Sequence, residues 1–487
     1  MYGMSDTAYG GFDPALKRLS AVVMLGAVMT VLDTTIVSVA ISTLGRDFDV
    51  SVATIQWVST GYLLALSMVI PLTGWAVERF GARRLWFASL ALFLAGSVLS
   101  GAAWSAGSLI AFRVVQGIGG GIILPVGQTM LARAAGPQRM GRVMSVVAVP
   151  ALLGPVLGPV IGGLIVDAIS WRWIFYVNLP VGAIALLAAW RWLEPDAHRR
   201  PDAPIDALGV ALLSPGLAAF VYGISEAGNV GLGGTQAVVG MAGGAALVAA
   251  FVAHALRTRD PLLGMRLFAD RVFAASSAAM ALFAATMFAV MLLFPLYEQA
   301  ARGLSALDAG LLMAPQGLAA MVAMPIAGKL TDMRGPRTLV LIGVAATVLG
   351  TIAFTQVSAD SSQALLAVSL VPRGIGMGFI MAPLMAAAYR TLSTEAVARA
   401  TPTMNIVMRI GGAVGTAVFA VLLQHRLGSA SPGSGAAHAY GVTFWWNLGA
   451  TALIALPALA LPALALPRGA AAPARAAVPP GAEVAPA

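Results

Sequence analysis

The sequence predicts an all-α membrane protein with fourteen transmembrane helices, and three observations carry that prediction. Of the 487 residues, 59% are hydrophobic and only 10% are charged, whereas a soluble domain has about 45–50% apolar and about 25% charged residues. Apolar stretches long enough to cross a bilayer recur along almost the whole chain,. Lysine and arginine gather in every second connection between them. Almost nothing is left over for a soluble domain.

The predicted spans lie between charged or Gly/Pro-rich breaks. They cover residues 19-44, 54-77, 85-105, 107-131, 142-168, 173-193, 207-226, 236-256, 272-297, 307-330, 338-357, 363-389, 398-424 and 441-466. The first run is too long for a signal-peptide core and lacks an A-x-A site, which indicates an uncleaved helix. The Pro/Ala-rich tail from 467 to 487 is expected to be disordered,.

The positive residues indicate the orientation of these spans. Most of the 29 Lys and Arg residues fall on the side of the N-terminus and of the even-to-odd connections. By the positive-inside rule this predicts a multi-pass protein of the cell inner (plasma) membrane with both termini cytoplasmic. The net charge of +9 therefore comes mostly from residues that set the orientation of the spans. Because it is spread over many short segments, no nucleic-acid partner is expected.

Several kinds of chemistry are excluded by the composition. The chain has no cysteine and four scattered histidines, so no metal site and no thiol chemistry are expected. It contains no ATP-binding P-loop, no G-x-S-x-G and no H-E-x-x-H,. These absences argue against an enzyme.

Two motifs recur at nearly one spacing. GWAVERFGAR from Gly74 aligns with GKLTDMRGPR from Gly328, 254 residues later, and QGIGGGII from Gln116 aligns with RGIGMGFI from Arg373, 257 residues later. The repeat predicts six plus two plus six helices. The expected units are a cytoplasmic N-terminus (1-18), a six-helix bundle (19-193), a linker with two extra helices (194-271), a second six-helix bundle (272-466) and the tail (467-487).

Five stretches carry a resemblance to a known family. They are LDTTIVSVAI at Leu32, GWAVERFGARR at Gly74, RVVQGIGGG at Arg113, GPVLGPVIGG at Gly154 and WRWIFYVNLPVG at Trp171. Together they resemble the major facilitator superfamily, and within it the fourteen-helix drug:proton antiporters of the EmrB/QacA type. The resemblance implies the major facilitator fold, with two pseudo-symmetric bundles and alternating access. It also implies multidrug efflux driven by the proton motive force without a cofactor. The alternative is a proton-coupled exporter of one specific metabolite, antibiotic or lipid.

Proton coupling is assigned to Asp33, with Arg113 and Gln116. Asp33 is the one acid well inside an apolar helix, where an ionised carboxylate is costly unless it has a partner. Arg113 lies at a comparable depth in the fourth span, and Gln116 follows one turn later,. A guanidinium near the carboxylate and desolvation act on its protonation in opposite directions. The alternative is a purely structural helix–helix hydrogen bond.

Conformational gating is assigned to the loop motif and to the fifth span. Glu78 is expected to form a cytoplasmic charge cluster with its neighbouring arginines, which breaks when the bundles move. Small residues in the fifth span let another helix approach closely, and the resemblance implies that they form a tight seam between the two bundles. Plain helix packing is the alternative for the seam. The assigned residues are Gly74, Glu78, Arg79, Gly81, Arg83, Arg84, Asp332, Gly154, Pro155, Gly158, Pro159 and Gly162.

Fewer residues point to the substrate. Polar and aromatic groups enter the second span and two arginines lie inside later spans, which gives Gln56, Trp57, Tyr62, Arg373 and Arg409 as cavity candidates. An interfacial belt is the alternative for Trp57, and backbone carbonyls as partners are the alternative for the arginines. With one membrane acid, we expect neutral or monocationic lipophilic substrates. The expected partners are this substrate, protons and the bilayer. The sequence is compatible with a monomer. It identifies no accessory envelope protein.

Overall fold

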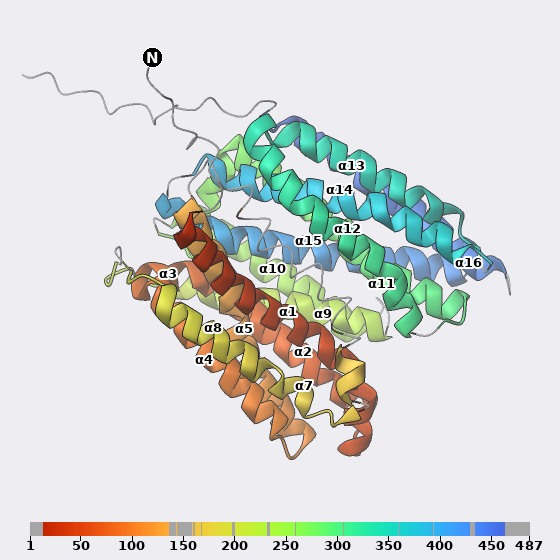
Figure 1. The fold of residues 1–487 in the computed structure, drawn as a ribbon, viewed down its shortest axis with the longest axis horizontal. Coiled ribbons are helices and arrows are strands. Elements are labelled where there is room, and N and C mark those ends of the chain that lie inside the picture. Colours follow the sequence, from red (N-terminus) through yellow and green to blue (C-terminus); the bar gives the residue numbers. More distant parts are fainter. Residues whose placement is uncertain are drawn as a thin grey trace, which may run out of the picture.

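The computed structural model describes most of the chain as helices (Figure 1). The described residues are 13–135, 143, 158, 161–166, 168–196, 200–230, 234–258, 260–304, 306–358, 360–392, 394–428 and 434–462. Among them, 13 helical segments are long and apolar enough to cross a membrane. They coincide in order with thirteen of the fourteen predicted spans. The other, 142-168, lies largely outside the described residues. The all-helical membrane architecture is thus confirmed.

The first half of the chain contributes the elements up to α8. They are α1 (Pro14–Asp47), α2 (Val52–Val69), η2 (Ile70–Leu72), α3 (Thr73–Phe80), α4 (Ala82–Gly101), α5 (Ala106–Ala135), α7 (Trp173–Tyr176) and α8 (Asn178–Trp192). Two predicted spans are interrupted: the second runs through α2, η2 and α3, with Pro71 in the short η2, and the sixth breaks between α7 and α8.

The middle and the second half of the chain contribute the remaining helices. They contain α9 (Ala207–Val230), α10 (Thr235–Arg257), η4 (Met265–Ala269), α11 (Arg271–Leu296), η5 (Tyr297–Ala301), α12 (Ala306–Arg334), α13 (Pro336–Ile352), η6 (Ala353–Gln356), α14 (Gln363–Arg390), α15 (Thr394–Gly428), α16 (Ser434–Leu453) and α17 (Ala455–Leu459).

Local chemistry sets several helix ends. Asp13 caps α1 by accepting from the Leu16 amide at 2.7 Å, with Pro14 at the first helical position,. The first helix therefore starts five residues before the predicted span. Gly81 separates α3 from α4 at φ 89°, and Gly335 separates α12 from α13 at φ 84°. Both need the left-handed region that glycine tolerates. They occupy the same place in the repeated loop motif, so the repeat extends to backbone conformation.

The helices pack into two groups joined by the extra pair. In the first group α5 contacts α1, α2 and α4, and in the second α14 contacts α11, α12 and α13. The extra helices α9 and α10 pair with each other, and α9 also contacts α2 and α15. In Figure 1 the two groups converge toward the end with α3 and the start of α15, and diverge toward the end with α7 and α16. We call the convergent end the α3 end.

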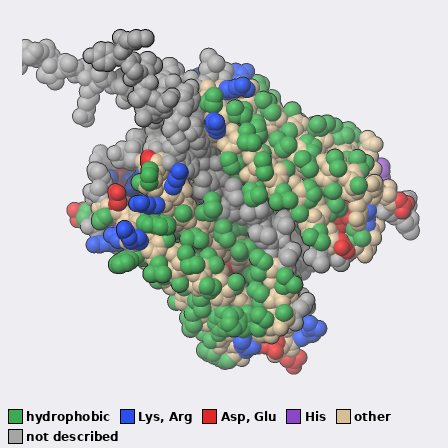
Figure 2. All heavy atoms as spheres, viewed as in Figure 1, with side chains coloured by type: hydrophobic (Ala, Val, Ile, Leu, Met, Phe, Trp, Pro, Cys, Tyr) green, Lys and Arg blue, Asp and Glu red, His purple; other side chains and the backbone are tan. Residues whose placement is uncertain are grey.

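The surface fits a bilayer environment. Figure 2 shows hydrophobic side chains covering the outer faces of both groups, while charged side chains gather at the two ends. Large apolar side chains such as Leu187, Val322 and Leu349 are 61–65% exposed. Exposure of this kind over so wide a band is stable where lipid tails, not water, surround the helices.

Candidate functional site

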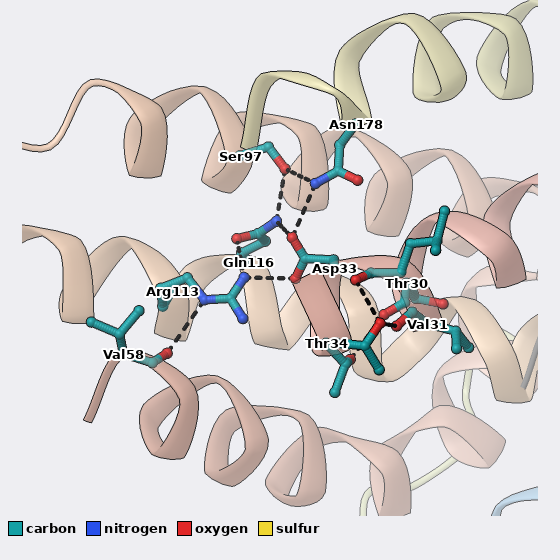
Figure 3. Close-up of polar contacts among 11 residues, drawn as sticks. Thr30, Val31, Asp33, Thr34, Val58, Ser97, Arg113, Gln116 and Asn178 are labelled. Atoms are coloured by element: carbon teal, nitrogen blue, oxygen red, sulfur yellow. Dashed lines mark hydrogen bonds and ion pairs between the residues drawn. The ribbon is translucent and has the colours of Figure 1, made fainter. Parts of the chain in front are cut away.

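Asp33 lies at the centre of a buried polar cluster within the first group of helices (Figure 3). Its Oδ2 accepts from Arg113 Nη1 of α5 at 2.6 Å, and its Oδ1 accepts from Gln116 Nε2 at 2.8 Å and from Asn178 Nδ2 of α8 at 3.0 Å. Ser97 Oγ of α4 accepts from both amides, at 2.7 and 3.2 Å. Asp33 and Arg113 are each 1% exposed. The structure thus brings together the three residues that the sequence assigned to coupling.

Arg113 has partners on every side. Besides Asp33, its Nη1 donates to Gln116 Oε1 at 2.7 Å, and its Nε donates to the Val58 carbonyl at 3.3 Å. The guanidinium carbon lies 4.0 Å from the centre of the Tyr62 ring and 5.7 Å from that of Phe175. Since arginine keeps its proton in proteins, the Arg113 charge stays opposite the Asp33 carboxylate.

Small residues make the cluster possible. A Cβ added to Gly96 would lie 2.6 Å from Gln116 Cβ, and one added to Gly117 would lie 2.5 Å from the Tyr62 carbonyl oxygen. Both are closer than real contacts allow, so α4 and α2 approach α5 only because glycine occupies these positions. The glycine-rich run after Gln116 therefore holds the polar groups at hydrogen-bonding distance.

The second group repeats part of this arrangement without the acid. Arg373 of α14, which aligns with Gln116, donates through Nη1 to Thr351 Oγ1 at 2.6 Å, as Gln116 donates to Ser97. Asn447 Nδ2 of α16 donates to the Thr286 carbonyl of α11 at 3.1 Å. Arg373 Nε is buried and has no hydrogen-bond partner among the described residues.

Thr351 stands 254 residues after Ser97, the spacing of the repeated loop motif, and Thr286 stands 253 residues after Asp33, one residue less. A hydroxyl-bearing residue therefore replaces the carboxylate in the second half, and an arginine replaces the glutamine.

Arg409 lies on α15 close to a contact between the two groups. Asn405 of α15 donates from Nδ2 to Gln128 Oε1 of α5 at 2.7 Å, and Arg409 follows it by one turn on the same face of the helix. Arg409 is half-buried. Of the other cavity candidates, Tyr62 is buried inside the first group and Arg373 inside the second.

The other two cavity candidates lie elsewhere on α2. The ring of Trp57 stacks on that of Tyr222 in α9, with centroids 5.7 Å apart, and the side chain is 39% exposed. Trp57 therefore packs against the extra pair of helices. Gln56 beside it is half-buried.

A second cluster joins the groups at the α3 end. Arg399 of α15 donates from Nε and Nη2 to the two oxygens of Glu78, at 2.9 and 3.2 Å. Its Nη2 also lies 3.5 Å from Asp260 Oδ1. The sequence-based expectation that Glu78 pairs with its neighbouring arginines is wrong, because the partner is an arginine 321 residues away.

The neighbouring arginines of the loop motif have other contacts. Arg79 donates to the Ala203 carbonyl at 3.1 Å, and the Arg83 amide donates to Asp196 at 3.1 and 3.2 Å. Arg84 is exposed. Gly74 is buried in α3, and a Cβ on Gly81 would meet the Asp196 carboxylate. The motif thus binds the connection between α8 and α9.

Asp206 stabilises the connections near the α3 end. Its carboxylate accepts from the amides of Gly209 and Leu262 at 2.8 and 3.1 Å and lies 2.8 Å from His254 Nε2. Burial acts to raise the pKa of Asp206, but these hydrogen bonds hold it below its usual value,. The carboxylate therefore stabilises the folded connection in its ionised form.

The described glycines of the fifth span contact α1. A Cβ on Gly162 would lie 2.8 Å from Ile36, and one on Gly158 would meet Thr35. These contacts lie within the first group, not in the expected seam between bundles. Gly154, Pro155 and Pro159, and the side chain of Asp332, lie outside the described residues.

Sequence reasoning missed several residues of these clusters. Asn178 stands inside WRWIFYVNLPVG, and Ser97 stands inside an apolar span. A polar side chain within a membrane span was the signal that could have identified both. Arg399 stands in the sequence as one of many Lys and Arg residues near the ends of spans, and nothing there distinguishes it. Gln128 and Asn405 join the two groups. In the sequence they are amides within apolar helices, and nothing else indicated that they contact one another.

Two pseudo-equivalent helix groups around buried charges define a polytopic transporter fold, and comparison with known proteins agrees. Residues 23–416 match the model of the Major Facilitator Superfamily. The chain therefore belongs to this superfamily, whose members are transporters.

The chain is also similar to named relatives and to solved structures. It is 44% identical over 420 residues to the Multidrug resistance protein B homolog of Mycobacterium tuberculosis, covering 85% of this chain and 77% of the relative. It is 30% identical to the Putative multidrug resistance protein MdtD of Cronobacter sakazakii, covering 90% and 92%. The human organic anion transporter MFSD10 superposes with a TM-score of 0.65 at 18% identity, covering 92% and 100%. At that identity the likeness shows the fold alone.

Proposed function

We propose that this chain is a multidrug efflux transporter that exchanges protons for lipophilic compounds by alternating access. Its membership of the superfamily and its relatives named for multidrug resistance support efflux. The observation that carries proton coupling is the Asp33 carboxylate, buried in the middle of a span and bound by donors from α5 and α8.

Protonation of Asp33 changes the balance of this cluster. The ionised carboxylate accepts three hydrogen bonds, and one is from a guanidinium. A proton on Oδ2 replaces an acceptor with a donor facing Arg113, so that contact becomes unfavourable. Arg113 retains Gln116 Oε1 and the Tyr62 ring. Because these partners come from α1, α4, α5 and α8, proton binding is transmitted to the packing of the first group.

The gate on the cytoplasmic side would be the cluster at the α3 end. In the proposed orientation this end faces the cytoplasm and both termini lie there. The Glu78–Arg399 pair and the Gln128–Asn405 hydrogen bond join the two groups at this end. The structure then corresponds to a state closed toward the cytoplasm, from which opening inward breaks both contacts.

The proposal is tested by reconstitution into liposomes with an imposed pH gradient. Internal pH and a panel of lipophilic compounds are followed together, with the Asp33→Asn variant as the control. Substrate-dependent proton movement that the variant lacks supports the proposal. Its absence across a broad panel contradicts it, and coupling to a single compound favours the specific-exporter alternative.

A further inference from the structure

The connection between α8 and α9 is attached to the first group of helices. The Ala203 carbonyl accepts hydrogen bonds from Trp75 Nε1 and from Arg79 Nη1, each at 3.1 Å. The Arg200 amide donates to the Glu78 carbonyl at 2.8 Å. The three partners belong to α3, the helix that contributes Glu78 to the proposed gate. This first connection is therefore fixed to one side of the gate.

The extra helices are attached to the same group. Ser214 Oγ of α9 donates to the Met68 carbonyl of α2 at 2.7 Å. The Tyr222 ring of α9 stacks on Trp57 of α2, with centroids 5.7 Å apart. Helix α10 packs along α9. From the end of α10 the chain must cross to α11, which belongs to the second group. The connection between α10 and α11 makes that crossing.

Asp206, at the end of the first connection, also binds the second. Its Oδ2 accepts from the Leu262 amide at 3.1 Å, and its Oδ1 lies 2.8 Å from Nε2 of His254 in the last turn of α10. The carboxylate is 5% exposed. Because the first connection is attached to α3, the start of the second connection is attached to α3 as well.

The second connection also contacts the arginine of the proposed gate. Asp260 Oδ1 lies 3.5 Å from Arg399 Nη2, and Arg399 Nε donates to Glu78 Oε1 at 2.9 Å. A Cβ added to Gly264 would lie 3.8 Å from Arg399 Cβ, which is an ordinary contact distance. Arg399 therefore contacts both α3 of the first group and the second connection.

These contacts, and not the length of the chain, restrain the second connection. An extended segment from 258 to 270 would reach about 45 Å, which leaves ample length for the two groups to separate at the α3 end. Opening that end moves α15 away from α3. Arg399 must then leave Asp260, or the second connection must leave Asp206. Because one of these losses accompanies opening, both contacts favour the closed state.

We propose that residues 260–269 form a strap that favours closure of the α3 end, with Asp206 and Asp260 as its positioning residues. The inference rests on the alternating access of the proposed function. It gives the extra helices a role, because they attach the strap to the first group while Asp260 attaches it to Arg399. Weakening either attachment should shift the population toward the state that is open at the α3 end.

The test measures distances between spin labels across each end of the full chain in nanodiscs. The chain has no cysteine, so introduced cysteines alone carry the labels. One pair, at Arg191 of α8 and Met333 of α12, spans the α3 end. The other pair, at Trp104 and Gln356, spans the opposite end, and all four side chains are exposed. Double electron–electron resonance gives the ratio of open to closed populations at each end.

The two attachments should have different weights. Loss of a partly exposed ion pair costs little, so Asp260→Asn should raise the open-to-closed ratio at the α3 end about two- to threefold. Asp206→Ala removes the buried acceptor of the Leu262 amide and should raise the ratio about tenfold. In the Arg399→Gln background, Asp260→Asn should have no further effect, because its partner is absent.

Two readouts separate this role from a general loss of structure. Alternating access closes one end as the other opens, so the open fraction of the Trp104–Gln356 pair should fall in the same variants. Asp270→Asn is the matched control. Asp270 accepts from the Val272 and Phe273 amides at 2.8 Å, and both belong to α11, so its loss should change neither ratio.

The outcomes separate this inference from the proposed function. Unchanged ratios in both Asp260→Asn and Asp206→Ala overturn the strap, and so does an equal effect of Asp270→Asn. Wider distances at both ends would also overturn it, because they would report loosening. If wild-type distances respond to pH or to a lipophilic compound while the strap variants behave as the wild type, the proposed function stands without the strap. Distances that stay fixed under every condition, in wild type and variants alike, would contradict alternating access itself, and the strap with it.

Discussion

Replacing Asp33 with Asn removes the negative charge while keeping nearly the same shape. The variant side chain can still accept from Gln116 and Asn178, which donate to Oδ1 at 2.8 and 3.0 Å. Its amide would then face Arg113 Nη1, which in the native protein donates to Oδ2 at 2.6 Å. Two donors would point at one another, and Arg113 would stay buried without a counter-charge.

The cost follows from this geometry. Removing one partner of a buried ion pair destabilises a protein by about 3–5 kcal/mol. Arg113 keeps Gln116 Oε1, the Val58 carbonyl and the Tyr62 ring, so we expect a loss of roughly 3 kcal/mol, at the low end of that range. The double variant Asp33→Asn with Arg113→Gln leaves no unpaired charge and should recover most of the loss.

The assay combines stability with transport. Unfolding of the wild type, both single variants and the double variant is followed in detergent, and pH-gradient-driven transport is measured in proteoliposomes. We expect stability to return in the double variant but transport to be absent from every variant that lacks the carboxylate. Gradient-driven transport in Asp33→Asn would refute the assignment of coupling. Equal stability of the single and double variants would refute the energetic argument.

Three further predictions concern other contacts. Asn178→Ala removes one hydrogen bond to the Asp33 carboxylate and should lower the free energy of unfolding by about 1–2 kcal/mol,; chemical unfolding of the variant at wild-type stability would contradict this. Glu78→Gln should weaken the closure of the α3 end and raise the maleimide reactivity of a cysteine placed at Thr401, buried at 0%, by about tenfold,. A cysteine at Trp104, 75% exposed at the other end, should react at an unchanged rate; equal rates at Thr401 would contradict the gate. Asp206→Asn should cost about 1–2 kcal/mol at neutral pH. Because the pKa of Asp206 is lowered, the stabilisation is complete above the unfolded value of about 3.9 and disappears as the pH falls through the folded value,. Thermal unfolding against pH tests this, and a difference that persists at pH 2 would contradict it.

The helices were predictable because the bilayer imposes a long apolar run on each. Thirteen of the predicted spans coincide with helices that the structure describes. The repeat was predictable because the backbone at Gly81 and Gly335 has a positive φ. Glycine is favoured at such positions, so the same residue recurs in both halves of the sequence. The Asp33 cluster was predictable in part, since a charge inside a span must find a partner and only Arg113 lay at a comparable depth in the first half. Asn178 and Ser97 were missed because neutral polar side chains carry no comparable cost.

The sequence by itself determined the class of protein, the order of its spans and the few charges inside them, since lipid tolerates neither loops nor unpaired charge at that depth. Only the tertiary structure decided which partners those charges have. Glu78 pairs with Arg399 of the other helix group and not with its sequence neighbours. Arg409 follows Asn405, which binds Gln128 of the other group, by one turn, while Arg373 binds Thr351 inside one group,. Such choices depend on the angles and depths at which helices pack, and linear spacing along the chain does not contain them.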